Sequence, residues 1–101
     1  MPMLQITPEE LRQQLTADTA PMLIDVREEW EREEFSIGGL HIPMGELPSR
    51  INEIPRDEDI VLYCEKGIRS VIAIQRLESM GYSRLGNLMG GMKAWKAMLT
   101  A

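Results

Sequence analysis

The sequence has very few of the residues that build disulfides and metal sites. Cys64 is its single cysteine, so the chain cannot form an internal disulfide, which is typical of a reducing compartment. His41 is its single histidine, and these two side chains are too few for a zinc site. We therefore expect no bound metal.

Long apolar stretches and export signals are also lacking. No apolar run approaches the roughly 20 residues that span a bilayer. The first residues contain neither a basic region nor the apolar core of a signal peptide. We therefore expect a cytoplasmic protein that does not bind membranes.

Positive charge is scarce as well. The formal net charge is -5 and the pI is about 4.8, which argues against nucleic acid as a partner, because binding it requires basic surfaces. The overall composition is that of an ordinary globular protein, with 44% hydrophobic and 27% charged residues. A length of 101 residues suits one core, so we expect residues 1–101 to form one domain.

Short apolar runs alternate along the chain with segments of helical spacing. We expect strands at 22–26, 40–43, 60–63 and 85–88. We expect helices at 8–15, 27–34, 48–54, 69–80 and 92–99. This alternation predicts an α/β fold with a small, mainly parallel sheet flanked by helices on both faces.

Two of these helices carry more detailed predictions. The first is predicted to begin with a capping box, because Thr7 precedes Pro8 and Glu10 follows three residues after Thr7. The helix expected at 69–80 should direct one group of apolar side chains toward the core. That group is Val71, Ile72, Ile74 and Leu77.

Cys64 follows the clearest strand, at the end where parallel sheets place their ligands. A cysteine reacts as its thiolate, which nearby cations and helix N-termini favour. Lys66, Arg69 and the start of the next helix supply both, and Gly67 permits a turn whose amides point inward as an anion-binding nest. We interpret Cys64 as a nucleophile; the alternative is an inert buried cysteine.

The length of the loop favours one chemistry over another. Cysteine phosphatases place an arginine after five intervening residues, where this chain has Ser70. Its arginine, Arg69, comes after four. The shorter loop suits a single sulfur atom better than a tetrahedral phosphate, although a small phosphatase or arsenate reductase stays an alternative.

Three stretches resemble the rhodanese-like sulfurtransferase family, in the family's order and spacing. They are DVRE at 25–28, CEKGIRS at 64–70 and NLMGGMKAW at 87–95. The resemblance implies a single rhodanese domain that needs no cofactor and transfers a sulfane sulfur through a persulfide on Cys64. The donor would be thiosulfate or a small-molecule or protein persulfide, and the acceptor cyanide or a thiol. The residues that it implies for holding the persulfide are Glu65, Lys66, Gly67, Ile68 and Arg69.

Other residues are assigned supporting roles around this loop. We expect Asp25, Arg27 and Ser70 to support its structure, and we expect His41 to form a hydrogen bond rather than act as a base. A non-catalytic rhodanese-like binding module is a further alternative, against which the retained cysteine argues. The sequence predicts no oligomeric state.

Two features depart from the family pattern. The segment 36–43 is shorter than usual and lacks its first histidine. Glu65 places a negative charge beside the sulfur, which disfavours a thiolate and opposes dianionic thiosulfate. We therefore expect a protein persulfide to be a better donor than thiosulfate.

Overall fold

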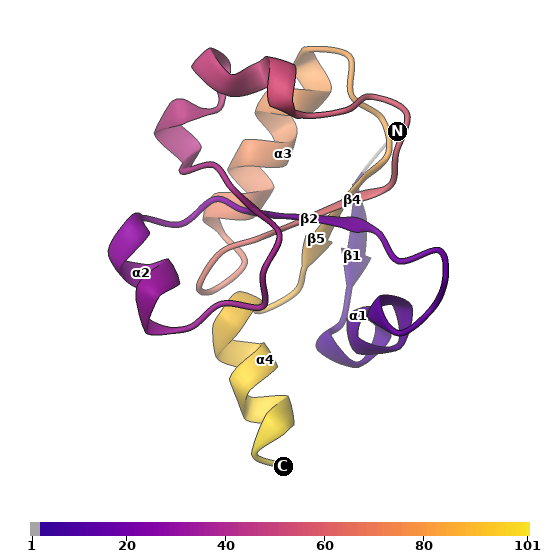
Figure 1. Ribbon diagram of the computed structural model, residues 1–101, viewed down its shortest axis with the longest axis vertical. Helices are drawn as coiled ribbons and strands as arrows, with labels where there is room; N and C mark the ends of the chain where they lie inside the picture. The colour runs from indigo at the N-terminus through magenta and orange to yellow at the C-terminus, as the bar shows by residue number, and fades with distance from the viewer. Residues whose placement is uncertain (1–2) are drawn as a thin grey trace.

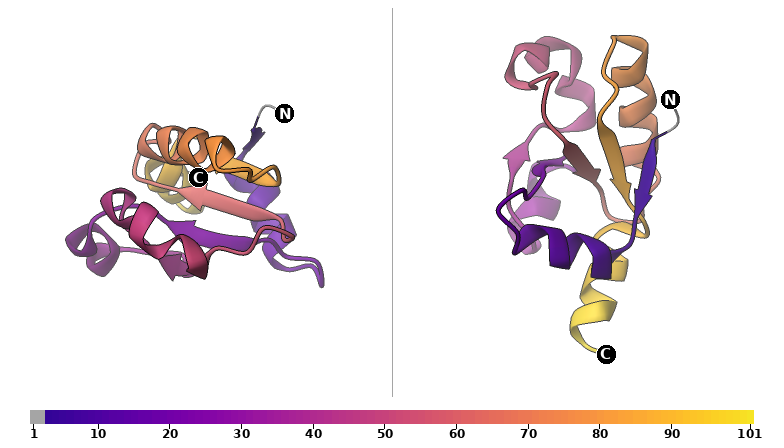
Figure 2. Two further views of the ribbon diagram at one scale, coloured as in Figure 1. Left: turned by 90° about the horizontal axis from the view of Figure 1, so that it is seen from above. Right: turned by 90° about the vertical axis from the view of Figure 1, so that its right-hand side faces the viewer.

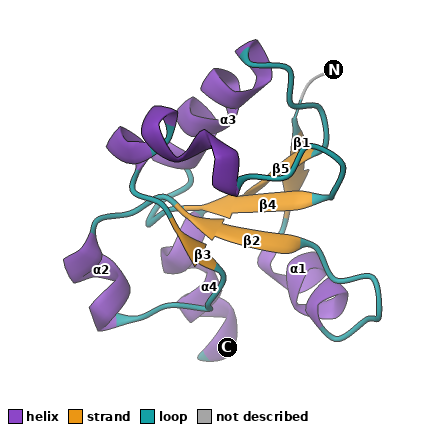
Figure 3. Cartoon of the chain, turned by 45° about the horizontal axis from the view of Figure 1, so that its top comes forward, coloured by secondary structure: helices purple, strands orange, loops and turns teal. Residues whose placement is uncertain are grey.

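The computed structural model describes residues 3–101 and contains one parallel sheet between two layers of helices (Figures 1 and 3). Five strands pair in the order β1-β5-β4-β2-β3, and every pairing is parallel. They are β1 (Leu4–Ile6), β2 (Met22–Asp25), β3 (Leu40–His41), β4 (Ile60–Tyr63) and β5 (Leu85–Leu88). The predicted fold class is confirmed.

The helices cover both faces of this sheet (Figures 2 and 3). The α-helices are α1 (Pro8–Leu15), α2 (Glu29–Glu34), α3 (Arg69–Ser79) and α4 (Gly91–Leu99). One core cluster joins the sheet to α3 and the segment around two 3-10 helices, Met44–Glu46 and Pro48–Glu53. The other joins the opposite face to α1 and α4. Within residues 3–101, no helix combines the length and the apolar character needed to cross a membrane.

Strand β4 lies at the centre of the molecule, and all four of its residues are buried. Ile60 and Leu62 belong to one core cluster, whereas Val61 and Tyr63 belong to the other. A strand covered on both faces needs apolar side chains at every position, which explains the uninterrupted run. This strand delivers Cys64 to the carboxyl edge of the sheet.

The predicted capping box of α1 is present. The amide of Glu10 donates to Thr7 Oγ1 over 3.1 Å, and the amide of Thr7 donates to Glu10 Oε1 over 3.0 Å. This reciprocal pair lowers the pKa of Glu10, because the hydrogen bonds favour its carboxylate.

The buried face of α3 differs from the prediction. Ser70, Ala73, Ile74 and Leu77 are its buried residues. Ile72 is exposed instead, and Val71 is half-buried. The buried residues follow the i, i+3, i+4, i+7 spacing from Ser70, and Ser70 is held against Cys64. The polar contact at the start of the helix therefore sets which face turns inward.

Other expected elements differ in type or extent. The segment predicted as a helix at 48–54 is a 3-10 helix with a break at Arg50. Helix α2 begins at Glu29 rather than at 27, because Arg27 is buried in the core instead. Strand β1 was not predicted: it has three residues, and Leu4 is exposed, so it carries almost no strand pattern.

Candidate active site

Cys64 is almost completely buried, with 1% of its surface exposed, directly after β4. Two backbone amides donate to its sulfur, from Gly67 over 3.1 Å and from Ser70 over 3.3 Å. The Ser70 amide belongs to the first turn of α3, where the helix dipole also favours negative charge. The predicted nest of inward amides therefore exists around this sulfur.

Gly67 makes the tight turn of the loop possible. Its φ of 85° lies in the left-handed region, which residues with a Cβ rarely adopt. A Cβ at this position would also lie 2.9 Å from the backbone nitrogen of Gly90. Both the backbone angle and the close approach require glycine here.

A hollow of about 410 Å³ lies beside the sulfur. It is lined by Glu31, Cys64, Glu65, Lys66, Ile68 and Arg69. The structure thus brings together the loop residues that the sequence singled out, and it adds Glu31 from α2. Lys66 and Ile68 are exposed and can contact a molecule that approaches the hollow.

Arg69 is engaged by an acid that the sequence analysis did not assign to the site. Its Nη1 and Nη2 donate to the two oxygens of Glu31 over 2.7 and 2.6 Å. These hydrogen bonds lower the pKa of Glu31, which burial opposes, and raise the pKa of Arg69. The guanidinium therefore joins α2 to the start of α3, and its charge is paired with that of Glu31.

Asp25, the last residue of β2, and Arg27 form a buried pair, as expected of supporting residues. Arg27 donates to Asp25 through Nε over 3.0 Å and through Nη2 over 3.1 Å. Burial by itself lowers the pKa of Arg27. The hydrogen bond to Asp25 and the negative charge of Asp25 raise this pKa by more than burial lowers it, so it lies above the ordinary value. Arg27 also donates to the carbonyl oxygen of Phe35 over 2.6 Å.

The same guanidinium changes the interpretation of Glu65. Nη1 of Arg27 donates to Glu65 Oε1 over 3.3 Å, so the Glu65 charge is balanced by a buried cation. The sequence suggested a free negative charge beside the sulfur. His41 contacts the same residue: its Nε2 lies 2.7 Å from the Arg27 carbonyl oxygen, which is a structural contact.

A buried polar chain lies behind the sulfur. Ser70 Oγ is 3.3 Å from Cys64 Sγ and donates to Asn87 Oδ1 over 2.5 Å. Asn87 Nδ2 then donates to Gln5 Oε1 on β1 over 2.9 Å. Sequence reasoning assigned no role to Asn87 or Gln5. A polar residue inside the apolar strand 85–88 was the available signal for Asn87.

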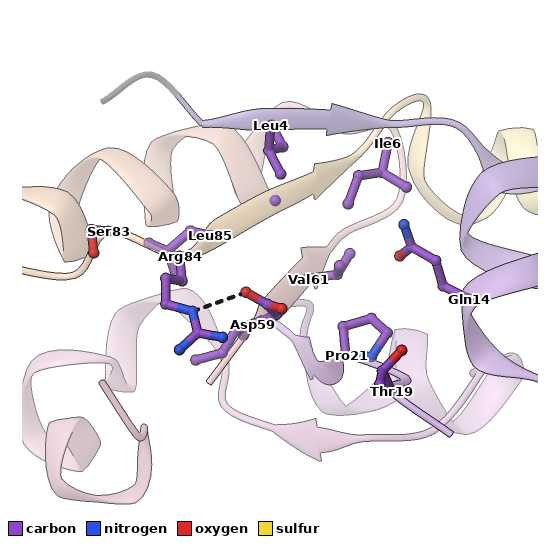
Figure 4. A pocket seen from close by; sticks show the side chains of 12 residues that line it. Leu4, Ile6, Gln14, Thr19, Pro21, Asp59, Val61, Ser83, Arg84 and Leu85 are labelled. Carbon is purple, nitrogen blue, oxygen red and sulfur yellow. Dashed lines mark hydrogen bonds and ion pairs between the residues drawn. The ribbon is translucent and has the colours of Figure 1, made fainter. Parts of the chain in front are cut away.

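Another hollow, of about 450 Å³, lies along β1 and at the amino ends of β4 and β5 (Figure 4). Leu4, Ile6 and Val61 line it, and an ion pair between Arg84 and Asp59, 3.0 Å long, lies beside it. Its lining contains no cysteine or histidine. Cys64 lies at the opposite end of the sheet, after the carboxyl end of β4.

The chain is similar to known proteins of one kind. A model of the rhodanese-like domain family matches residues 7–98. A sulfurtransferase of Allochromatium vinosum is 40% identical over 92 residues, which are 90% of this chain and 86% of that protein. The putative sulfur carrier protein YrkF of Bacillus subtilis is 34% identical over 92 residues, 90% of this chain but 50% of that protein.

A solved structure supports the same grouping. The crystal structure of a rhodanese-like domain protein from Staphylococcus aureus superposes with a TM-score of 0.85 at 31% identity. The match covers 92% of this chain and 91% of that one. Sequence and fold therefore agree over nearly the whole length.

Proposed function

We propose a function from the premise that this chain belongs to the rhodanese-like domain family, a family with sulfurtransferase members. The proposal is that residues 1–101 act as one domain that transfers a sulfane sulfur through a persulfide on Cys64. The observation that carries it is the pair of amides, of Gly67 and Ser70, that donate to the cysteine sulfur. Amides aimed at sulfur stabilise an anion there without any metal or organic cofactor.

The reaction has two displacement steps. The Cys64 thiolate attacks the sulfane sulfur of the donor, a new S–S bond forms on Cys64, and the donor's own S–S bond breaks. The donor leaves as a thiolate, or as sulfite when it is thiosulfate. A thiol or cyanide acceptor then attacks the outer sulfur, and Cys64 leaves as the thiolate that began the cycle.

The charges around the hollow favour a persulfide donor over thiosulfate. Arg69 is paired with Glu31, and Arg27 with Asp25 and Glu65. Lys66 is the cation of the hollow that forms no ion pair within residues 3–101. One exposed lysine offers little attraction for a dianion, because solvent screens it. The persulfide group of a low-molecular-weight or protein donor carries a single negative charge, and thiosulfate carries two.

Intact-mass measurement tests the proposal. The protein is incubated with thiosulfate or with glutathione persulfide, and the expected product gains one sulfur atom, about 32 Da, that a thiol reductant removes. Cys64→Ser should gain no sulfur. Absence of the adduct with both donors would contradict the proposal and favour the non-catalytic module, whereas hydrolysis of an aryl phosphate would favour the phosphatase.

A further inference from the structure

The polar chain behind Cys64 has a direction, which is set by the hydrogens available to it. Ser70 has one hydroxyl hydrogen, and it donates that hydrogen to Asn87 Oδ1, an atom that can only accept. Ser70 Oγ can therefore only accept from the Cys64 sulfur at 3.3 Å. In this arrangement the hydroxyl suits a protonated thiol, which donates, and not a thiolate.

The direction depends on Gln5 at the far end. Asn87 presents its oxygen to Ser70 because its nitrogen donates to Gln5 Oε1. Ser70 and Asn87 are buried, whereas Gln5 is exposed on the edge strand β1. Within residues 3–101, Gln5 Nε2 has no hydrogen-bond partner, so the Gln5 amide can turn over together with that of Asn87 without leaving a buried group unpaired.

We propose that Gln5, Asn87 and Ser70 form a reversible hydrogen-bond relay that sets whether the Ser70 hydroxyl accepts from Cys64 or donates to it. In the reversed state Gln5 Nε2 donates to Asn87 Oδ1, and Asn87 Nδ2 donates to Ser70 Oγ. The hydroxyl hydrogen then points at the sulfur. Each direction joins the same neighbouring residues by one hydrogen bond each, so reversal keeps the number of hydrogen bonds in the relay.

This relay, which rests on the proposed function for its role in catalysis, adds a third donor at the moment when sulfur carries charge. The Gly67 and Ser70 amides donate in both directions. The hydroxyl would join them when Cys64 is the attacking thiolate and again when it leaves as a thiolate. Gln5 and Asn87 are thus positioning residues that act through Ser70.

Substitution of Gln5 can fix the relay in either direction. Gln5→Glu supplies an acceptor alone, which holds Asn87 Nδ2 toward residue 5 and keeps the Ser70 hydroxyl pointing away from sulfur. Gln5→Lys supplies donors alone, which holds Asn87 Oδ1 toward residue 5 and directs the hydroxyl to sulfur. Because residue 5 is exposed on an edge strand, both variants should fold.

The readout is the rate of alkylation of Cys64 by iodoacetamide, measured as a function of pH on the full chain. We expect Gln5→Glu to move the midpoint of the rate profile to higher pH and Gln5→Lys to move it to lower pH. Gain or loss of one hydrogen bond to an anion predicts roughly a tenfold or larger change in the thiolate fraction, and with it in the rate, below the midpoint. Sulfur loading is not needed for this measurement.

Controls separate the relay from the added charge itself. Leu4→Glu and Leu4→Lys place the same charges on the neighbouring exposed residue of β1 and should shift the profile little. In a Ser70→Ala background, the two Gln5 variants should give one common profile. Asn87→Leu interrupts the relay at a different point and serves if Ser70→Ala does not fold. The charged groups around the hollow are unchanged in all variants: Glu31, Glu65, Lys66 and Arg69 line it, and Arg27 and Asp25 are linked to Glu65.

The outcomes are distinct. Opposite shifts that disappear in the interrupted background support the relay. Shifts of the same sign, or opposite shifts that persist with Ser70→Ala and Asn87→Leu, overturn it. If the Gln5 variants show these opposite shifts in alkylation but the wild-type protein gains no sulfur from any donor, the proposed function is contradicted and the relay is still supported.

Discussion

Arg69 and Glu31 form a two-point hydrogen bond across the mouth of the hollow, although 38 residues separate them in the sequence. The acid belongs to α2 and the arginine to the first residue of α3. Glu31 is mostly buried, and Arg69 is about one-third exposed. This pair therefore determines how the loop that carries Cys64 is closed on one side.

Glu31→Gln should destabilise the fold by about 1–2 kcal/mol, because it removes a charge-assisted pair and leaves Arg69 incompletely bonded. The free energy of unfolding in urea measures the loss. The matched control is Glu53→Gln, which breaks an exposed pair with Arg50 on the surface. Exposed pairs contribute at most about 1 kcal/mol. Equal losses in the two variants would contradict the structural role of the Glu31 pair.

The same pair predicts a pH dependence. The hydrogen bonds from Arg69 lower the pKa of Glu31 below its ordinary value of 4.5. The unfolded chain therefore takes up this proton at a higher pH than the folded chain. The pair stabilises the fold fully at pH values above 4.5, and this stabilisation is lost as the pH falls through the lowered pKa of Glu31 in the folded chain. We expect wild type to lose more stability than Glu31→Gln over this acidic range. Urea midpoints measured at a series of pH values check this, and parallel curves would refute it.

Glu65→Gln should make Cys64 more reactive toward anionic reagents. The substitution removes a negative charge from the lining of the hollow and leaves the Arg27 cation less neutralised. We expect a roughly three- to tenfold faster gain of sulfur from thiosulfate, and a smaller change with cysteine persulfide, whose net negative charge is smaller. Glu58→Gln, in the exposed turn before β4, changes the net charge equally and should have no effect. An equal gain with both donors would argue against repulsion between Glu65 and thiosulfate, and would indicate that Glu65 acts only on the Cys64 thiolate.

Gly67→Ala should disrupt the loop that surrounds the sulfur. The new Cβ meets a left-handed φ of 85° and the Gly90 nitrogen at 2.9 Å, so we expect a loss of about 1–3 kcal/mol and little sulfur adduct. Gly45→Ala is the matched control, because its Cβ would have no heavy atom within 4 Å and its φ is not positive. Full sulfur loading by Gly67→Ala would show that the turn does not need glycine.

The sequence predicted the parts of the fold that local pattern determines. The continuous apolar run 60–63 identified β4, and its position before Cys64 placed the cysteine at the carboxyl edge of the sheet. Thr7 and Glu10 predicted the start of α1, because a capping box is a contact between residues three apart.

Contacts between distant residues were not predictable in the same way. Glu31 resembled any other acid of the charged segment 27–34, and its pairing with Arg69 depends on how α2 and α3 are placed. Strand β1 pairs with β5 rather than with its neighbour in sequence, so the contact of Gln5 with Asn87 followed from topology alone. Proximity in the sequence singled out Cys64 and its loop, whereas the contacts of Glu31, Asn87 and Gln5 came from the assembled fold.

The burial of Cys64 affects how long a persulfide formed on it would last. With 1% of the residue exposed and two amides already directed at the sulfur, water and passing thiols have little access to it. A persulfide formed there would decay slowly in dilute solution and be released quickly only to an acceptor shaped to enter the hollow. The lifetime of the loaded state, more than its rate of formation, would then determine which molecules receive the sulfur.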